Sequence, residues 1–232
     1  MSKHLTVLGA FVACTFGCLA SSAQAGPLVT NGSFEQTTLG TKGSFLNNVF
    51  GWSGGSKLTF LDFPGTASTT YLAVYPGLPA TSPNGGNFVE MDGDPNYSSA
   101  ISQTLSGLTI GNSYMVNFYQ AAGQQNGFKG PTTELWQVGF GNDMQKSSKY
   151  SLKQGETGNW GYQTMTFTAK AVTELLSFLA VGTPTGAPPI SFLDGVSVVD
   201  ATAVPEASSW AIFGAGLAAL VGIVTFRQRR FA

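Results

Sequence analysis

Carboxylates are the main reactive side chains in the long middle part of this sequence. Residues 26–200 contain eleven Asp and Glu against seven Lys, a net charge of −4, and no Arg, His or Cys. Nucleophiles activated by His, and zinc sites built from His and Cys, are therefore excluded from this part of the chain. Acid–base chemistry by a carboxylate pair, or binding of a hard cation by carboxylate oxygens, remains open. The net charge of the whole chain is close to zero, so nothing indicates nucleic acid as a partner.

Three carboxylates are candidates for acid–base chemistry on a polysaccharide. A glycosidase needs two such groups within several ångströms of one another. The positions of Glu90, Asp92 and Glu134 along the chain do not show that any two of them meet. We therefore expect a protein that is not an enzyme. A glycosidase or lyase that relies on carboxylates alone is the alternative.

Aromatic side chains offer a second kind of chemistry, because a ring can stack on the apolar face of a sugar while amides bind its hydroxyl groups. We predict Trp136 and Tyr97 as the ligand-binding rings, with Tyr71 and Trp160 as further candidates. Trp52 follows a glycine near the start of the chain and is expected in the core. For every Trp the alternative is packing in a hydrophobic core.

The elements that position these side chains are expected to be strands. Residues 162–168 alternate, with Gln163, Met165 and Phe167 on one face, and residues 101–105 alternate in the same way. Further strands are expected at 113–119, 175–181 and 192–199. Clusters of Gly, Pro and Asn separate these segments. The pattern predicts an all-β fold, a single jelly-roll β-sandwich over residues 26–200, flanked by a signal helix and a transmembrane helix.

The N-terminal residues have the pattern of a secretory signal. Lys3 precedes an apolar run at 5–20, and Ala23 and Ala25 form a small-x-small cleavage site. Residues 1–25 are therefore predicted to be removed by signal peptidase, and a retained membrane anchor is the alternative. The two cysteines of the chain lie in this segment. The mature protein is thus expected to have no disulfide bond.

The C-terminal residues have the pattern of a membrane stop. Residues 201–209 form a linker, and the uncharged residues 210–226 make a helix of about 25 Å, near the lower limit for crossing a bilayer. Residues 227–232 form a basic cytoplasmic tail. Its positive charges are Arg227, Arg229 and Arg230. A buried core helix is the alternative for the apolar segment.

Val204, Pro205 and Glu206 stand just before the apolar segment. A Val-Pro-Glu motif, an apolar helix and a terminal Arg cluster, in this order, resemble the PEP-CTERM sorting signal, a tail that is also labelled an ice-binding protein C-terminal domain. The resemblance covers residues 204–232, and Ala207 stands where the commoner motif has a second Pro. It implies recognition of the motif by an exosortase, a membrane-embedded processing enzyme, in a Gram-negative bacterium. Pro205 keeps the motif extended for entry into the enzyme's cleft.

Five short motifs along residues 28–199 carry a second resemblance. They are NGSFE at 31–35, GW at 51–52, NFVEMDG at 87–93, ISQT at 101–104 and LDGVS at 193–197. Their order resembles galactose-binding-like jelly rolls, including carbohydrate-binding modules. The resemblance implies that Glu35 and Asp194 meet around a structural calcium ion, which takes carboxylate and carbonyl oxygens as ligands. A pair of solvated turn carboxylates is the alternative.

Together these patterns predict an exported bacterial surface or matrix protein. We expect an inner-membrane-anchored precursor that is sorted to the cell surface or the extracellular matrix. Its jelly roll is expected to bind extracellular polysaccharide without catalysis. A structural envelope protein with no small ligand is a further alternative.

Overall fold

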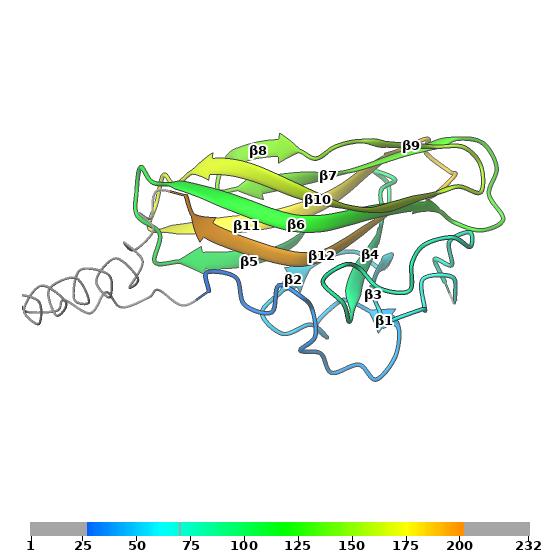
Figure 1. Cartoon of the computed structure of the whole chain (residues 1–232), viewed down its shortest axis with the longest axis horizontal. Helices are drawn as coiled ribbons and strands as arrows, with labels where there is room; N and C mark the ends of the chain where they lie inside the picture. Colours follow the sequence, from blue (N-terminus) through cyan, green and yellow to red (C-terminus); the bar gives the residue numbers. More distant parts are fainter. Residues whose placement is uncertain (1–26, 70, 202–232) are drawn as a thin grey trace, which may run out of the picture.

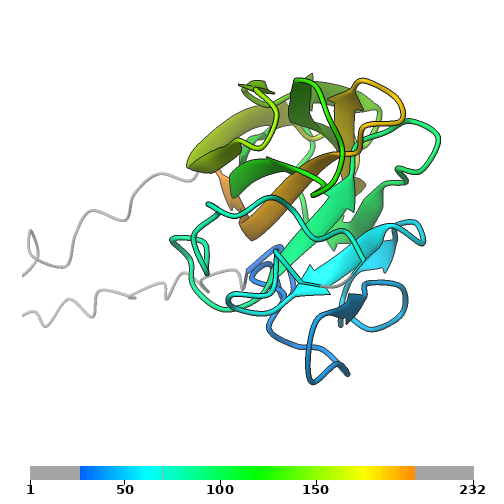
Figure 2. The same cartoon turned by 90° about the vertical axis from the view of Figure 1, so that its right-hand side faces the viewer.

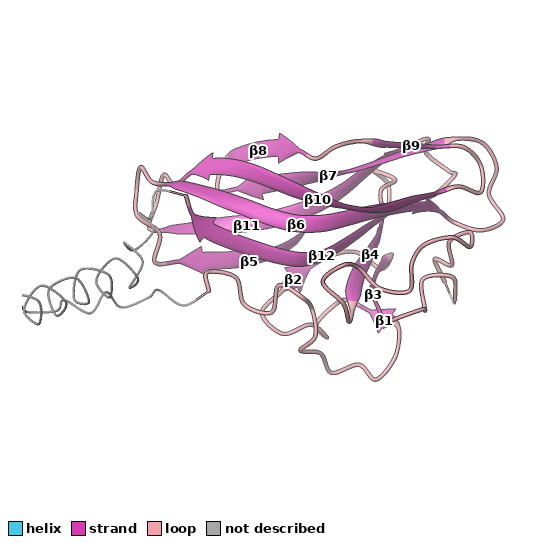
Figure 3. Cartoon of the chain, viewed as in Figure 1, coloured by secondary structure: helices cyan, strands magenta, loops and turns pink. Residues whose placement is uncertain are grey.

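Two antiparallel β-sheets pack face to face in the described part of the protein (Figure 1). The computed structural model describes residues 27–69 and 71–201. Every regular element within these residues is a strand (Figure 3), which confirms the all-β prediction. No helix long and apolar enough to span a membrane occurs in this part of the chain. The predicted signal peptide, sorting motif, transmembrane segment and basic tail lie outside the described residues.

The strands differ greatly in length, from two to twelve residues. They are β1 (Gly43–Ser44), β2 (Ser53–Gly54), β3 (Thr59–Asp62), β4 (Phe88–Asp92), β5 (Ile101–Ser106), β6 (Ser113–Gln124), β7 (Thr132–Phe140), β8 (Asp143–Lys146), β9 (Tyr150–Leu152), β10 (Thr157–Thr168), β11 (Thr173–Thr183) and β12 (Pro189–Asp200).

The strand order from β4 to β12 is that of a jelly roll. The first sheet has the order β1-β3-β4-β12-β6-β10, and the second has the order β2-β5-β11-β7-β8, with β9 also paired to β7. When β4 is numbered as strand 1, β8 and β9 together as strand 5 and β12 as strand 8, the order in the first sheet is 1-8-3-6. The order in the second sheet is 2-7-4-5. This interleaving is the double Greek key of a jelly roll.

Alternate residues of the long strands fill the interior between the sheets. Ile101 and Leu105 of β5 point inward, as do Met165 and Phe167 of β10. Side chains of a strand point to its two faces in turn, so these residues reach one core. Trp52 belongs to the same core. The predicted strand faces and the predicted core position of Trp52 are confirmed.

The outer face of the first sheet is divided into two halves. On one half, the described residues of the connection between β3 and β4, 63–69 and 71–87, lie over the sheet. Its Leu72 and Val74 pack with Phe88 of β4 and Phe192 of β12 in a second hydrophobic cluster. We call this part the covered half. It is defined by Phe60, Asp62, Phe88, Glu90 and Phe192.

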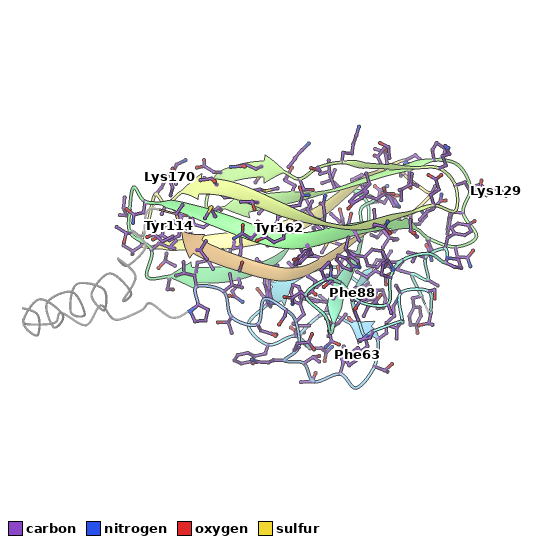
Figure 4. The ribbon with its side chains drawn as sticks, in the orientation of Figure 1. Phe63, Phe88, Tyr114, Lys129, Tyr162 and Lys170 are labelled. Carbon is purple, nitrogen blue, oxygen red and sulfur yellow. The ribbon has the colours of Figure 1, made fainter. Side chains whose placement is uncertain are left out.

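Over the other half of that face, the described residues form no such cover. Its residues are paired across three neighbouring strands. Tyr119 of β6 pairs with Tyr162 of β10. Asn117, also on β6, pairs with Thr164 of β10 on one side and with Ser197 of β12 on the other. We call these five residues the open half. Figure 4 shows Tyr162 over the long strands and Phe88 further along the sheet, beside the loops.

The described chain begins and ends at the same end of the sandwich. In Figure 1 the first described segment, in blue, and the tip of β12, in orange, lie at the left. The Ala201 N–H donates to the Ser113 C=O at 2.8 Å, which fixes the end of β12 beside the start of β6. Figure 2 looks from the opposite end, where connecting loops gather.

Candidate functional site

Two tyrosine rings form the centre of the open half. The centroids of Tyr119 and Tyr162 are 5.0 Å apart, with 58° between the ring planes. Tyr162 is 57% exposed, and Tyr119 is half-buried beneath the same surface. The two residues are directly opposed across β6 and β10, so the backbone register holds the rings together.

A shallow hollow borders this pair of rings. Its lining consists of Gly32, Ser33, Asn84, Tyr119, Tyr162, Gly195, Val196 and Ser197. None of these side chains is a carboxylate or an amine. Gly195 has a φ of 60°, and a Cβ there would lie 3.1 Å from the Tyr119 ring and 3.2 Å from Asn84. Glycine therefore both allows this backbone conformation and leaves the space beside the ring free.

Neutral polar side chains surround the rings. Thr164 Oγ1 donates to Asn117 Oδ1 at 2.9 Å, and Thr164 and Ser197 are exposed on either side of Asn117. Aromatic rings with a polar edge, beside hydroxyl and amide groups, can bind a molecule that has both apolar C–H faces and many hydroxyl groups. The open half therefore has the chemistry of a sugar-binding surface.

The prediction for Trp136 is wrong, because this side chain has no exposed surface. Its Nε1 donates to the Phe192 C=O at 2.9 Å, and its ring contacts Phe178 in the core. Trp136 points to the same face of β7 as the buried Val138 and Phe140. That alternation was available in the sequence and indicates a core position.

Tyr97 lies in the connection between β4 and β5 and is 53% exposed. It is not among the residues that line the hollow beside the open half. Its role in ligand binding therefore stays a prediction. Tyr119 and Tyr162 were not predicted as site residues. A signal existed for Tyr162, which alternates with the inward-pointing Met165 and Phe167 and therefore faces outward with Thr164.

The charge of Glu35 acts on Asp194, so the two carboxylates lie in the same region of the protein, and a calcium ion between them stays a prediction. Asp194 is fully buried, accepts the Ser82 hydroxyl and accepts the Gly195 N–H at 2.6 Å. Burial is the largest influence and raises the pKa of Asp194 to about 7. The bonds from Ser82 and Gly195 lower that pKa, and the charge of Glu35 raises it. Glu35 itself is exposed and accepts the Asn87 N–H at 2.7 Å.

The donors around this carboxylate pair suit a hard cation. Glu35, Asp194, Ser82 and Asn84 offer oxygen atoms, which calcium prefers. A Cβ at Gly86 would come within 1.8 Å of Glu35 Oε1, so only glycine leaves this carboxylate its place. Within the described residues, no three or more His, Cys, Asp or Glu side chains gather as metal ligands. A cation here would therefore need hydroxyl, amide or backbone oxygens besides the two carboxylates.

The candidate catalytic carboxylates are enclosed. Glu90, Asp92 and Glu134 are each at most 1% exposed. Lys42 Nζ lies 2.7 Å from Glu90 Oε2 and 3.2 Å from Asp62 Oδ1, and all three side chains are buried. Burial raises the pKa of Glu90 well above its usual range and that of Asp62 to about 6, while Lys42 opposes both shifts. A polymer outside the protein cannot reach these groups.

No family model matches the chain, and no curated protein matches it. Several solved structures that are similar to it are carbohydrate-binding modules. A family 61 module in complex with β-1,4-galactotriose has 15% identity and a TM-score of 0.41, and the match covers 76% of this chain and 99% of that one. The CBM22-1 xylan-binding domain from Paenibacillus barcinonensis has 14% identity and a TM-score of 0.42, with 79% and 100% covered.

A bacteriophage enzyme domain is also similar to the chain. The enzymatically active domain of tailspike protein 4 from bacteriophage CBA120 has 11% identity and a TM-score of 0.39, and the match covers 74% of this chain and 21% of that one. Likenesses at these identities and TM-scores assign no ligand and no activity to this chain.

Proposed function

We propose that this protein binds extracellular polysaccharide through the open half and does not cleave it. The observation that carries the proposal is the exposed Tyr162 packed on the half-buried Tyr119, beside a hollow with no charged side chain in its lining. One ring face would stack on a sugar, and the exposed Thr164 and Ser197 would exchange hydrogen bonds with its hydroxyl groups, while the buried Asn117 would hold Thr164 in place. No segment of the described residues covers this surface, which leaves it accessible to a polysaccharide.

A non-catalytic role is favoured over a carboxylate-dependent glycosidase or lyase. The candidate acids Glu90 and Glu134 are enclosed, and the lining of the open hollow has no carboxylate. The test is affinity electrophoresis or an array of soluble polysaccharides, combined with an assay for new reducing ends. Binding without release supports the proposal. Release of reducing ends that is lost in Glu90→Gln or Glu134→Gln would establish the enzyme instead, and no binding would leave a structural envelope protein.

We further propose that Glu35 and Asp194 hold a structural calcium ion. The ion would link the segment before β1 to the last strand, with Ser82 and Asn84 supplying neutral oxygens. Because the pKa of Asp194 is about 7 without a metal, calcium would displace a proton and bind more tightly as the pH rises through 7. At a calcium concentration 100 times Kd, the free energy of unfolding should rise by about 2.7 kcal/mol, which corresponds to an increase of roughly 5–10 °C in Tm.

The calcium test compares thermal unfolding in excess calcium and in EGTA. Asp194→Asn should abolish the difference, and Asp143→Asn, at an exposed carboxylate, should retain it. An unchanged Tm in the wild-type protein would contradict the calcium site. It would leave the polysaccharide proposal untouched, because the open half needs no metal.

Export and sorting complete the proposed function. The protein would be exported with cleavage after Ala25 and held in the inner membrane by residues 210–226. An exosortase would then process it at Val204–Glu206 for the cell surface or matrix. The intact mass of the native protein tests this: a chain that begins at Gly26 and ends near 204–206 is expected. A mass that still includes residues 210–232 would contradict processing of the tail.

A further inference from the structure

In the described part of the chain, four polar side chains inside the sandwich carry oxygen atoms that make no hydrogen bond of ordinary geometry. These atoms are Gln120 Oε1, Thr132 Oγ1, both carboxylate oxygens of Glu134, and Ser191 Oγ. Each of the four residues is at most 2% exposed. Buried polar atoms nearly always have a partner, because leaving one without a partner costs about 1–3 kcal/mol. Five such oxygens within one interior need a physical explanation.

The strand pairing places these residues around one level of the interior. Glu134 and Thr132 point inward from β7, as Trp136 does. Trp136 Nε1 donates to the Phe192 C=O. This bond places the Trp136 ring beside Phe192. Gly182, which pairs with Glu134, lies against Pro189, so Glu134 faces the start of β12, where Ser191 also points inward. Thr132 is close enough to Glu134 for its hydroxyl to lower the pKa of that carboxyl.

Gln120 approaches the same level from β6. It pairs with Leu193 of β12 and is therefore the diagonal neighbour of Ser191. Its Nε2 donates to the Ser148 C=O at 2.8 Å, just before Tyr150, which pairs with Glu134 across β9 and β7. The amide nitrogen of Gln120 is thus used in a bond to the connection between β8 and β9, and its oxygen remains available.

Within the described residues Glu134 has no basic partner, in contrast to the buried acids Asp62 and Glu90. Asp62 and Glu90 share the ammonium group of Lys42. Among the described residues no ion pair reaches Glu134, and only burial and the Thr132 hydroxyl shift its pKa. Burial has the larger effect and raises that pKa to about 7. An ionised carboxylate in such a place needs a positive charge beside it.

We propose that Glu134, Thr132, Ser191 and Gln120 form a site for a monovalent cation, Na⁺ or K⁺, between the two sheets. The donors are oxygens only, as a hard cation requires. One carboxylate and one monovalent ion leave no net charge in the interior, whereas a divalent ion would leave one positive charge uncompensated. This site is separate from the calcium site proposed at Glu35 and Asp194, and it does not depend on polysaccharide binding.

The test measures thermal unfolding of the purified full-length protein near pH 8, in EGTA, with NaCl, KCl or tetramethylammonium chloride at one ionic strength. We expect Tm to be higher in at least one metal salt and to rise by about 3–5 °C for each tenfold increase of that ion above its Kd. Near pH 5 a proton occupies Glu134, so the difference between the salts should be lost.

Glu134→Gln keeps the shape of the side chain but removes its charge, and it should abolish the preference for metal salts. Glu156→Gln, at a carboxylate about half exposed beside Lys153, is the matched control and should keep the preference. Should Glu134→Gln fail to fold, Ser191→Ala retains the carboxylate and should require several times more cation for the same Tm. Equal Tm values in the three salts, or an unchanged preference in a folded Glu134→Gln or Ser191→Ala protein, would overturn the proposal.

Discussion

The covered half and the open half belong to one face of one sheet, yet they present opposite surfaces. β12 runs through both: Phe192 is fully buried beneath residues 63–87, whereas Ser197 is exposed. β6 shows the same contrast between the buried Ala121 and the partly accessible Tyr119. The strands are continuous, so the difference arises from what lies on top of the sheet.

The chemistry of the two halves also differs. The covered half contains the charged groups Lys42, Asp62 and Glu90, enclosed where they contact one another and not the solvent. The open half has rings, hydroxyls and an amide. Reactive side-chain types alone would have pointed to the wrong half. Because the covered half is buried and the open half is accessible to solvent, we assign a role in stability to the covered half and a role in binding to the open half.

The largest effect is expected when the buried ion cluster loses its cation. Lys42→Met would leave Asp62 and Glu90 without a counter-charge in the interior, so the free energy of unfolding should fall by about 3–5 kcal/mol. Urea denaturation measures it. Lys170→Met removes an exposed pair with Asp143 and should cost at most about 1 kcal/mol. Equal losses in the two variants would mean that the covered half does not depend on its ion cluster.

The next effect is a loss of stability at higher pH. Burial raises the pKa of Asp62 and Asp92 to about 6, and that of Glu134 and Asp194 to about 7. The folded protein therefore holds protons that the unfolded chain releases, so stability is greatest in mild acid and falls as the pH rises through 6 and 7.

Without added metal ions, the free energy of unfolding should decrease by at least about 2 kcal/mol between pH 5 and pH 8. Urea denaturation at the two pH values measures this change. Binding of polysaccharide by the folded protein should change much less over the same range, because no carboxylate or amine lines the open hollow and Asp194, which bonds to Gly195 of the lining, is fully buried. Constant or rising stability would contradict the buried acids, and a large change in affinity would contradict the uncharged site.

A smaller effect is expected at the polar edge of the open half. Thr164→Val removes one exposed hydroxyl and its bond to Asn117, so polysaccharide affinity should fall by about threefold to tenfold. Thr168→Val, at the end of the same strand, is the control and should leave the affinity unchanged. Isothermal titration measures both. A loss in the control alone would place the ligand elsewhere on β10.

The sequence predicted the strands whose residues alternate strongly. Every second residue of β5 and β10 is apolar, so that one face of each strand must be buried. The inward-pointing residues are Ile101, Leu105, Met165 and Phe167. The same logic applied to β7 would have placed Trp136 in the core, where the structure has it. The alternation of apolar and polar residues is a local property, so the buried face of a strand can be predicted from the sequence alone.

The division of the outer face could not be predicted in this way. Both Tyr162 and Phe88 lie on outward-facing positions of the first sheet, but only Phe88 is covered. The cover comes from residues 63–87, whose path depends on long-range contacts. Lys42 likewise meets Glu90 only after β1, β3 and β4 have paired. Contacts of this kind have no signature within a short stretch of sequence.

The most direct test of the account compares two exposed tyrosines. Tyr162 belongs to the open half, whereas Tyr71, which is 80% exposed, stacks on Phe60 above the covered half with centroids 5.7 Å apart. For a polysaccharide that the wild-type protein binds, Tyr162→Ala should lower the affinity at least about tenfold, or about 1.4 kcal/mol. Tyr71→Ala should change it less than about twofold. A loss with Tyr71→Ala and none with Tyr162→Ala would contradict binding at the open half.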